Sequence, residues 1–410
     1  MSGATLKRDL RTGRSLWADS PGLRVPVRAL NEAVVCDVAV VGAGISGAFM
    51  AHELSRDHSV IVLDRRPPLT GSTMASTAML QWEIDLPLTV LSQRIGAEKA
   101  RRAYRRSFAA VAALKQVVAE EGIRCGRKDK AALYLAGDAY GRRALEAEAE
   151  ARAALGLDSV FMGPAELRER FGIERTGAIL SQGAASADPA RLAAGLLRRA
   201  ATAGARIFSP VEVSQAASDP EGVTLLTDAG HAVRARRVVF CCGYEFPKGV
   251  PTPGAEVIST WALASLPRTR CPTWLRDTLV WEGSDPYLFP HGRGRAADRR
   301  RRGRGRSHGP RRSSEAEAQV RDHRRQAAPP AAGGRVRDRL RLGWGVWRKR
   351  HRPAVHSTGA GHGPRLGGDG VRRQRHHLFR HRQSGGGGGL PRRSGCRRGP
   401  VSPRMTRRAS

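Results

Sequence analysis

Three glycines at fixed spacing are the residues of this chain best suited to hold a ligand. Gly42, Gly44 and Gly47 form the pattern G-x-G-x-x-G directly after a short apolar run, Val38 to Val41. In such a loop the first glycine allows a tight turn, the second lets the backbone approach a pyrophosphate, and the third lets the next helix pack closely on the strand. The phosphates then meet free N–H groups and the positive end of the helix dipole. The spacing therefore predicts a dinucleotide site.

Asp64 lies at the position where a dinucleotide site has an acidic residue. Residues 59–63 form a second apolar run, and Asp64 follows it, twenty positions after Gly44. A carboxylate there can accept hydrogen bonds from the hydroxyl groups of a ribose. Strand, glycines, helix, strand and acid in this order are much more specific than the glycines alone. The alternative is a glycine turn in an ordinary βαβ unit.

The segment after Asp64 indicates which dinucleotide binds. Residues 71–85, GSTMASTAMLQWEID, are rich in small hydroxyl side chains that can line a pyrophosphate and a flavin. This segment resembles the D-amino-acid oxidase-like family of FAD-dependent oxidoreductases, and the resemblance covers about residues 30–290. It implies FAD as the cofactor, whereas an NAD-dependent dehydrogenase fits the hydroxyl-rich segment less well. Besides the three glycines, the cofactor-binding residues that it implies are Asp64, Arg65, Ser72, Thr73, Ser76, Thr77, Val211 and Gly243.

Several of these residues also fit purely structural roles. Hydroxyl side chains cap helices and form turns, and Val211 fits a core position better than an adenine contact because apolar strand residues are usually buried. His52 and His231 fit structural or solvent-exposed positions. The aromatic residues Tyr244, Trp261 and Tyr287 could line a substrate cavity, but packing is the better interpretation. The sequence therefore assigns no catalytic acid or base.

The patterns around the motif predict the domain organisation. Asp188 at the N-cap, Pro189 after it and Gly204 past the end delimit one helix, and residues 130–138 and 279–290 have the pattern of strands between long helices. The predicted fold class is α/β, a Rossmann-like FAD-binding domain with an inserted, mainly antiparallel α+β substrate domain. The predicted parts are an N-terminal extension (1–33), the split FAD-binding domain (34–85 and 186–250) and the substrate domain (86–185 and 251–290).

The remaining residues, 291–410, differ sharply in composition. The 410-residue chain has a formal net charge of +34, and this segment holds 34 Lys and Arg against 6 Asp and Glu, with no Ile, Tyr or Asn. So few branched and aromatic residues cannot offset the entropy lost on folding. We therefore expect a basic low-complexity tail that is largely disordered.

The reading frame offers an explanation for this tail. The family carries further FAD-domain strands and a glycine-rich segment here, and nothing after Pro290 resembles them as written. Read one nucleotide later, however, residues 344–357 (WGVWRKRHRPAVHS) are compatible with GAFGESATGLPFI, and residues 371–382 (VRRQRHHLFRHR) with YGGNGITFSAIA. Both strings resemble the missing segments, in the right order. We interpret residues 291–410 as out-of-frame translation; a nucleic-acid arm and a plain linker are the alternatives.

Two further features bear on localisation and partners. No apolar run approaches the roughly 20 residues of a membrane helix, and the N-terminus lacks the apolar block of a secretory signal. The six cysteines show no metal-ligand spacing. We expect a cytoplasmic protein without a bound metal or membrane partner, and no specific nucleic-acid binding.

The resemblance implies oxidation of a C–N bond, with hydride passing from the carbon that bears an amine to the flavin. The implied substrate is a small amine or amino acid, and the electron acceptor is oxygen or another oxidant. Because the closing part of the FAD domain is missing, we expect the chain as written to be inactive. The alternative function is a non-catalytic FAD- or nucleotide-binding protein with a basic nucleic-acid-interacting tail.

Overall fold

The computed structural model describes residues 4–7, 15–250, 257–264, 272–284 and 341–349, without the side chains of 257–264 and 341–349. All of these lie in one compact unit, Met1–Pro353. The second unit, Ala354–Ser410, lies outside the described residues.

A six-stranded sheet carries the glycine motif. Its order is β7 (Arg206–Phe208), β2 (Val60–Leu63), β1 (Val34–Val41), β10 (Ala232–Phe240), β9 (Gly222–Thr227) and β8 (Val213–Asp219). The first four strands run parallel, and β8, β9 and β10 form an antiparallel meander. Helix α1 (Ile45–Leu54) connects β1 to β2. The predicted order of strand, glycine loop, helix and strand is therefore present in a Rossmann-like sheet.

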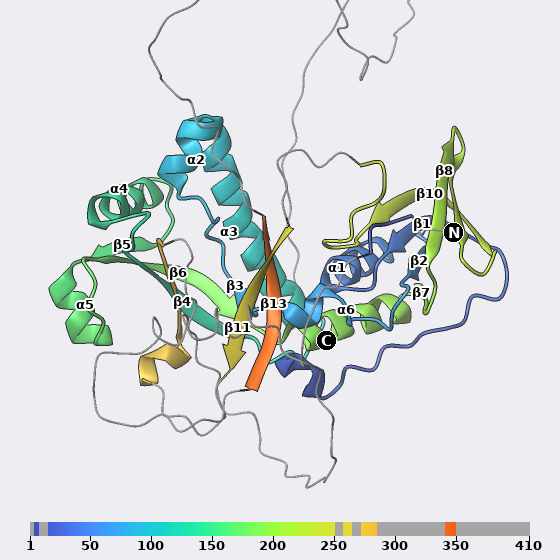
Figure 1. The fold of residues 1–410 in the computed structure, drawn as a ribbon, viewed down its shortest axis with the longest axis horizontal. Helices are drawn as coiled ribbons and strands as arrows, with labels where there is room; N and C mark the ends of the chain where they lie inside the picture. The colour runs from blue at the N-terminus through green and yellow to red at the C-terminus, as the bar shows by residue number, and fades with distance from the viewer. Residues whose placement is uncertain (1–3, 8–14, 251–256, 265–271, 285–340, 350–410) are drawn as a thin grey trace, which may run out of the picture. The chain divides into compact units, whose positions relative to one another are not determined.

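Alternation along the central strands gives this sheet two buried faces. Val38, Val40 and Val62 belong to one hydrophobic cluster, whereas Ala39 and Ile61 belong to another. Two-sided burial explains why the strands are continuous apolar runs. Helices α1 and α6 (Pro189–Thr202) lie side by side (Figure 1) and contribute to the first cluster.

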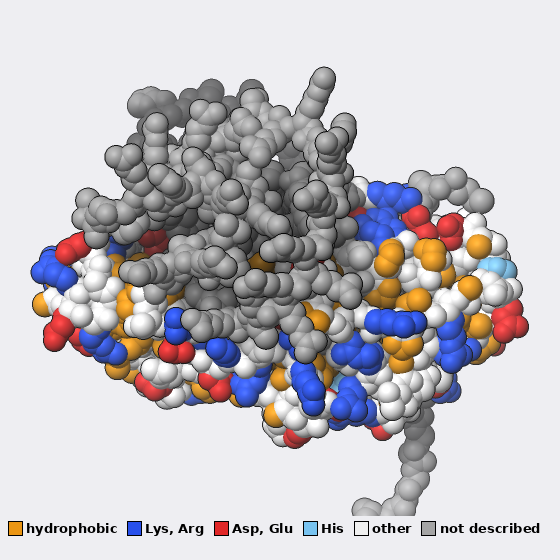
Figure 2. Space-filling model, turned by 90° about the horizontal axis from the view of Figure 1, so that it is seen from below, with side chains coloured by type: hydrophobic (Ala, Val, Ile, Leu, Met, Phe, Trp, Pro, Cys, Tyr) orange, Lys and Arg blue, Asp and Glu red, His pale blue; other side chains and the backbone are white. Residues whose placement is uncertain are grey.

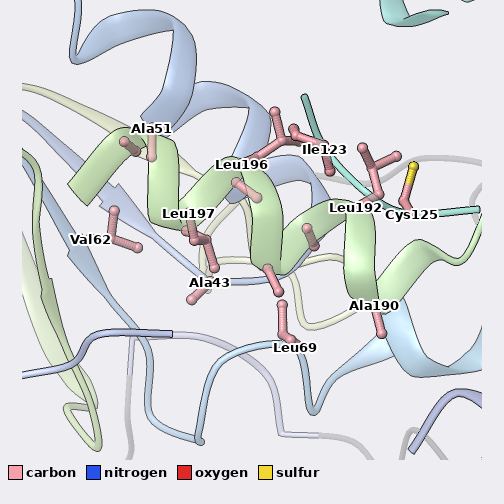
Figure 3. Close-up of a cluster of buried hydrophobic side chains, with 14 of the residues drawn as sticks. Ala43, Ala51, Val62, Leu69, Ile123, Cys125, Ala190, Leu192, Leu196 and Leu197 are labelled. Carbon is pink, nitrogen blue, oxygen red and sulfur yellow. The ribbon is translucent and has the colours of Figure 1, made fainter. Parts of the chain in front are cut away.

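Helix α6 runs through the centre of that cluster and begins and ends as predicted. Figure 3 shows its side chain Leu192 next to Cys125. The Asp188 carboxylate accepts hydrogen bonds from the first backbone N–H groups of the helix, Pro189 is the first helical residue, and Gly204 follows with φ +101°. These caps satisfy polar groups that a buried helix would otherwise leave unpaired.

A second sheet forms the other half of the unit. Its order is β12 (Thr278–Glu282), β4 (Lys128–Leu135), β6 (Ala178–Ser186) and β3 (Met79–Leu80), with β5 (Ser159–Met162) also on β6. The helices between its strands are α2 (Leu88–Ile95), α3 (Ala97–Glu120), α4 (Arg142–Ala153) and α5 (Pro164–Phe171). Pairs that include β6 are antiparallel, and β12 lies parallel to β4. The sheet is mainly antiparallel, as predicted.

The chain enters this second sheet earlier in the sequence than predicted. Strand β3 pairs Met79 with Ser186, so the chain joins the second sheet before the predicted boundary at residue 85. The described residues also form three short 3-10 helices: η1 (Leu16–Asp19), η2 (Ser72–Ala75) and η3 (Thr273–Arg276). The exact domain boundaries stay a prediction.

One pair of strands includes residues of the tail. Strand β13 (Arg341–Lys349) lies within the segment predicted to be largely disordered, yet it pairs antiparallel with β11 (Val257–Ala264), with Val257 opposite Lys349 (Figure 1). Composition describes side chains, whereas strand pairing is made by backbone groups that every residue except proline can supply. The rest of residues 285–410 lies outside the described residues, and so does the prediction of disorder for it.

The described surface carries mixed charge. On the face seen in Figure 2, Lys and Arg side chains are interspersed with acidic and hydrophobic ones. Among the described residues, no helix combines the length and apolar character needed to cross a membrane. Within the same part of the chain, no three His, Cys, Asp or Glu side chains gather in a way that could hold a metal ion.

Candidate cofactor-binding site

The three glycines of the motif have different surroundings. Gly42 has φ +114°, and a Cβ atom built on it would lie 2.5 Å from the carbonyl oxygen of Cys241. A Cβ atom on Gly47 would lie 1.8 Å from the carbonyl oxygen of Gly42. Gly44 is different, because a Cβ atom there would meet only the Thr73 hydroxyl, at 3.0 Å. The turn and the close helix packing thus require Gly42 and Gly47, whereas Gly44 faces a more open space in which a ligand can approach.

Asp64 ties the end of β2 to this loop. Its Oδ2 accepts a hydrogen bond from the Ala43 N–H at 2.7 Å, and its Oδ1 accepts one from the Arg66 N–H at 2.9 Å. Burial raises the pKa of Asp64, and these two N–H groups oppose that rise. Each carboxylate oxygen has a second lone pair. Asp64 can therefore hold the loop and still accept a ribose hydroxyl.

The hydroxyl side chains of the segment 71–85 have different hydrogen-bonding roles. The Thr73 hydroxyl accepts a hydrogen bond from the Ile45 N–H at 2.8 Å, so it caps the start of α1, where Gly44 has no side chain to do so. Ser76 is exposed, and its hydroxyl accepts from the Ala78 N–H at 3.0 Å, as in a turn. These two hydroxyls therefore serve as a helix cap and in a turn, whatever further contacts they make. Thr77 is half-buried.

Ser72 differs from Thr73 and Ser76 in its hydrogen bonding. Its hydroxyl oxygen is buried and has no hydrogen-bond partner among the described residues. A buried hydroxyl without a partner is costly, because its lost hydration is not replaced. A Cβ atom built on Gly243, which has φ +58°, would lie 3.6 Å from this oxygen. The structure therefore brings Ser72 and Gly243 together, although they lie far apart in sequence.

Val211 is a core residue, as the packing interpretation has it. It is buried in the second cluster of the six-stranded sheet, and its backbone N–H donates to the Asp64 carbonyl at 2.8 Å. It thus lies next to the predicted ribose-binding residue without a polar group of its own to offer.

Two charged residues at this site were not predicted. The Glu245 carboxylate is almost fully buried and accepts hydrogen bonds from the guanidinium groups of both Arg65 and Arg66. Arg65, which was predicted, also lies 3.8 Å from the Glu212 carboxylate. The pairing of Glu245 with Arg66 is not evident from the sequence, because the two residues come together only when β10 pairs with β1. The only sequence signal is that both lie close to predicted residues, Gly243 and Asp64.

These residues fit FAD. They gather where β1, β2 and β10 end, and ligands of open α/β sheets bind outside the carboxyl ends of the strands. The open face at Gly44, the unpaired hydroxyl of Ser72 and the arginine pair are what a dinucleotide diphosphate requires: close backbone approach, hydrogen-bond donors and positive charge.

The comparison with protein families decides the assignment. A family model described as FAD dependent oxidoreductase (DAO) matches residues 37–380. The chain belongs to this family. FAD is accordingly its cofactor. The match continues past Pro290, where the resemblance was expected to end, so that expectation was too narrow; the matched range includes strand β13.

Individual relatives are more distant. The Bacillus subtilis (strain 168) protein YhfW, provisionally named a Rieske 2Fe-2S iron-sulfur protein, is 25% identical over 249 residues, which are 60% of this chain and 48% of that protein. This chain thus spans about half the length of that curated relative.

Solved structures of related proteins are similarly distant. Glycine oxidase from Geobacillus kaustophilus is 24% identical, with 61% of this chain and 66% of that chain covered and a TM-score of 0.48. L-proline dehydrogenase from P. horikoshii is 18% identical, with 62% and 65% covered and a TM-score of 0.46.

The histidines and aromatic residues weighed as functional candidates lie in different parts of the fold. His52 is buried in α1, and its Nε2 lies 2.9 Å from the Glu121 carboxylate, so it is structural. His231 lies in the turn before β10. Tyr244 is half-buried, and burial, together with the charge of Asp85, raises its pKa. The side chains of Trp261 and Tyr287 lie outside the described residues.

Proposed function

We propose that this chain is an FAD-dependent oxidoreductase of the type that oxidises the C–N bond of a small amine or amino acid. When bound, FAD supplies the hydride acceptor for the carbon that bears the amine, and water then hydrolyses the imine product. The observation that carries the proposal is the convergence of the open face at Gly44, the unpaired hydroxyl of Ser72 and the arginine pair at one end of the parallel strands. Family membership supports the coarser class, an FAD-dependent oxidoreductase.

The chain's own residues would then bind and orient the cofactor. The N-terminus of α1 offers its free N–H groups and dipole to the diphosphate, Asp64 accepts from the adenosine ribose, and the Ser72 hydroxyl is available as a donor. The remaining predicted contacts, at Arg65, Thr73, Ser76, Thr77, Val211 and Gly243, belong to the same proposal. The catalytic acid or base and the electron acceptor are not assigned.

We further propose that the 410-residue chain as written is inactive. The out-of-frame interpretation of residues 291–410 supports this, because it removes the segment that the resemblance places near the flavin ring. Cytoplasmic localisation and the absence of specific nucleic-acid binding belong to the same proposal.

A cofactor spectrum combined with an amine panel tests the function. Flavin absorbance in the purified protein, with peroxide formation or dye reduction on addition of one class of amine, is the expected result for the version restored to the other frame. A protein that binds FAD but oxidises no member of the panel would instead support the non-catalytic alternative. A protein without flavin affinity would contradict both.

A further inference from the structure

Arg65, Arg66 and Glu245 form what we call the arginine clamp. Glu245 Oε2 accepts from Nη2 of Arg66 at 2.5 Å, and Glu245 Oε1 accepts from Nη2 of Arg65 and, at 3.3 Å, from Nη1 of Arg66. The Glu245 side chain is only 4% exposed. A buried carboxylate is stable only when it is paired and hydrogen-bonded, so Glu245 is held firmly and in turn fixes both guanidinium groups.

The clamp is part of a larger group of charged side chains. Arg65 lies between Glu245 and Glu212, and Glu212 also pairs with Lys7 at 2.8 Å. The Asp64 carboxylate also interacts electrostatically with both arginines, so three carboxylates accompany three cations here. Arg66 shares the Glu245 carboxylate with Arg65. Its Nε is also buried without a hydrogen-bond acceptor among the described residues.

The position of Arg66 relates this charge to the cofactor site. A Cβ atom built on Gly71 would lie 3.5 Å from Nη2 of Arg66, and Gly71 directly precedes Ser72. The Arg66 backbone N–H is bonded to Asp64. Glu245 comes two residues after Gly243, which approaches Ser72. The guanidinium of Arg66 thus lies beside the start of the hydroxyl-rich segment, and the Arg66 backbone is bonded to the predicted ribose-binding residue.

We propose that Arg66 is a diphosphate-binding residue of the FAD site and that Glu245 is the residue that positions it. A guanidinium already fixed by a carboxylate loses little further side-chain freedom when it binds a phosphate oxygen. The N-terminus of α1 offers only partial charge, whereas Arg66 adds a full one to a doubly negative diphosphate. This inference rests on FAD binding and is independent of the substrate.

The test measures the dissociation constants of FAD, ADP and riboflavin for the 410-residue chain and for the version restored to the other frame. Arg66→Gln should raise the dissociation constants of FAD and of ADP by about tenfold each, the loss expected for one charge-assisted hydrogen bond. The dissociation constant of riboflavin, which has no phosphate, should stay within about twofold. The slope of log Kd for ADP against log salt concentration should also become shallower.

A matched control is Arg234→Gln. Arg234, on β10, is paired with Asp219, at the end of β8, at 2.6 Å, and its side chain is 30% exposed, compared with 34% for Arg66. This variant should leave all three dissociation constants unchanged. The proposal is wrong if Arg66→Gln weakens the binding of riboflavin as much as that of ADP. It is also wrong if this variant weakens the binding of neither FAD nor ADP.

The positioning role of Glu245 needs a double-mutant cycle. Glu245→Gln should also raise the dissociation constant of ADP. The double variant should have an ADP dissociation constant no higher than that of the single variant with the lower ADP affinity, because both substitutions act through one guanidinium. Additive losses would contradict the positioning role. If Glu245→Gln does not fold, as judged by circular dichroism, Glu245→Asp takes its place in the cycle. If Arg66→Gln weakens the binding of FAD and ADP but not of riboflavin, and the unmodified protein oxidises no amine, this inference is supported and the proposed function is wrong. If the unmodified proteins bind neither FAD nor ADP, both are wrong.

Discussion

The Nε atom of Arg152 donates a hydrogen bond to Oε1 of Glu148 across 2.7 Å, and both side chains are completely buried. Glu148 also accepts from the backbone N–H groups of Leu88 and Thr89, at 2.8 and 2.9 Å, and so caps α2. The Arg152 guanidinium lies 5.4 Å from the centroid of the Trp82 ring. This ion pair therefore joins α4, the start of α2 and the aromatic core of the second sheet.

Replacing Arg152 by Met should destabilise the protein strongly. The variant leaves Glu148 buried without its cation, and breaking a buried pair in this way costs about 3–5 kcal/mol. Arg142→Met is the matched control, since Arg142 pairs with Glu146 on the exposed surface of the same helix, where such pairs contribute about 0.3–0.5 kcal/mol. Urea unfolding of both variants measures the difference. Equal midpoints would show that the buried pair contributes no more than the exposed one.

A second carboxylate beside Arg152 should make stability depend on pH. The Glu83 side chain is 1% exposed, and its Oε1 lies 3.9 Å from Nη1 of Arg152. Burial raises the pKa of Glu83, and the Arg152 charge opposes the rise only in part. The folded protein thus keeps this proton to a higher pH than the unfolded chain. The stabilisation is complete below the ordinary glutamate pKa and is lost as the pH rises through the raised one.

The variant Glu83→Gln isolates this effect. Glutamine cannot ionise, so the variant should gain stability relative to the unmodified protein as the pH rises from about 4 to 8. Thermal unfolding midpoints of both proteins across that range give the comparison. The prediction is wrong if the difference between the two midpoints is independent of pH.

Gly44→Val should abolish FAD binding while the protein stays folded. A valine side chain would fill the space in which the diphosphate approaches the backbone and would press on the Thr73 hydroxyl, which a Cβ atom alone would approach to 3.0 Å. Gly141→Val is a suitable control, because Gly141 is also the N-cap of a helix in extended backbone and has nothing within 4 Å of a built Cβ atom. Flavin content by absorbance reports the result. Normal flavin content in Gly44→Val would refute the placement of the site.

Asp64→Ala should weaken FAD binding more mildly. The change removes one or two charge-assisted hydrogen bonds to the ribose, about 1.5–3 kcal/mol each, and also the acceptors for Ala43 and Arg66. Asp64→Asn separates these effects, since its amide oxygen still accepts one of the two backbone hydrogen bonds. Calorimetric titration with FAD, together with the thermal midpoint of each variant, provides the measurement. Unchanged FAD affinity in Asp64→Ala would mean that the carboxylate serves only the loop.

The chain as written should be poorly soluble and should have little oxidoreductase activity, and a version restored to the other frame after about residue 289 should bind FAD and oxidise an amine. Val35 and Phe240, on neighbouring strands, are 71% and 36% exposed, and a tail with so high a positive charge has little apolar surface with which to cover them. Flavin content, thermal unfolding and dye reduction across an amine panel compare the two versions. Equal folding and activity would overturn the out-of-frame interpretation. Sequencing the DNA around residues 288–292 tests it directly.

Local signals predicted the parts of the site that depend on one stretch of chain. The glycine spacing, the two apolar runs and Asp64 specify the loop because each acts through its own backbone, and the caps of α6 at Asp188 and Gly204 do the same. The arginine clamp and the pair of Arg152 with Glu83 were not predictable in this way. Their members come from separate parts of the chain, and only the tertiary arrangement brings a charge to its partner. The β13 strand was missed for a related reason, because its pairing depends on a distant backbone.

The order of strands in the six-stranded sheet has a consequence for how the protein is made. Strand β2 pairs with β7, Ile61 opposite Arg206, and β1 pairs with β10, Val34 opposite Val233. During translation β1, α1 and β2 therefore leave the ribosome well before the strands that cover both of their edges. Long-range parallel pairing is slow, and exposed strand edges attract other chains. The nascent chain thus exposes both edges of this strand pair over this interval. Because Glu245 follows β10, the arginine clamp can form only after both ends of this sheet segment have been made.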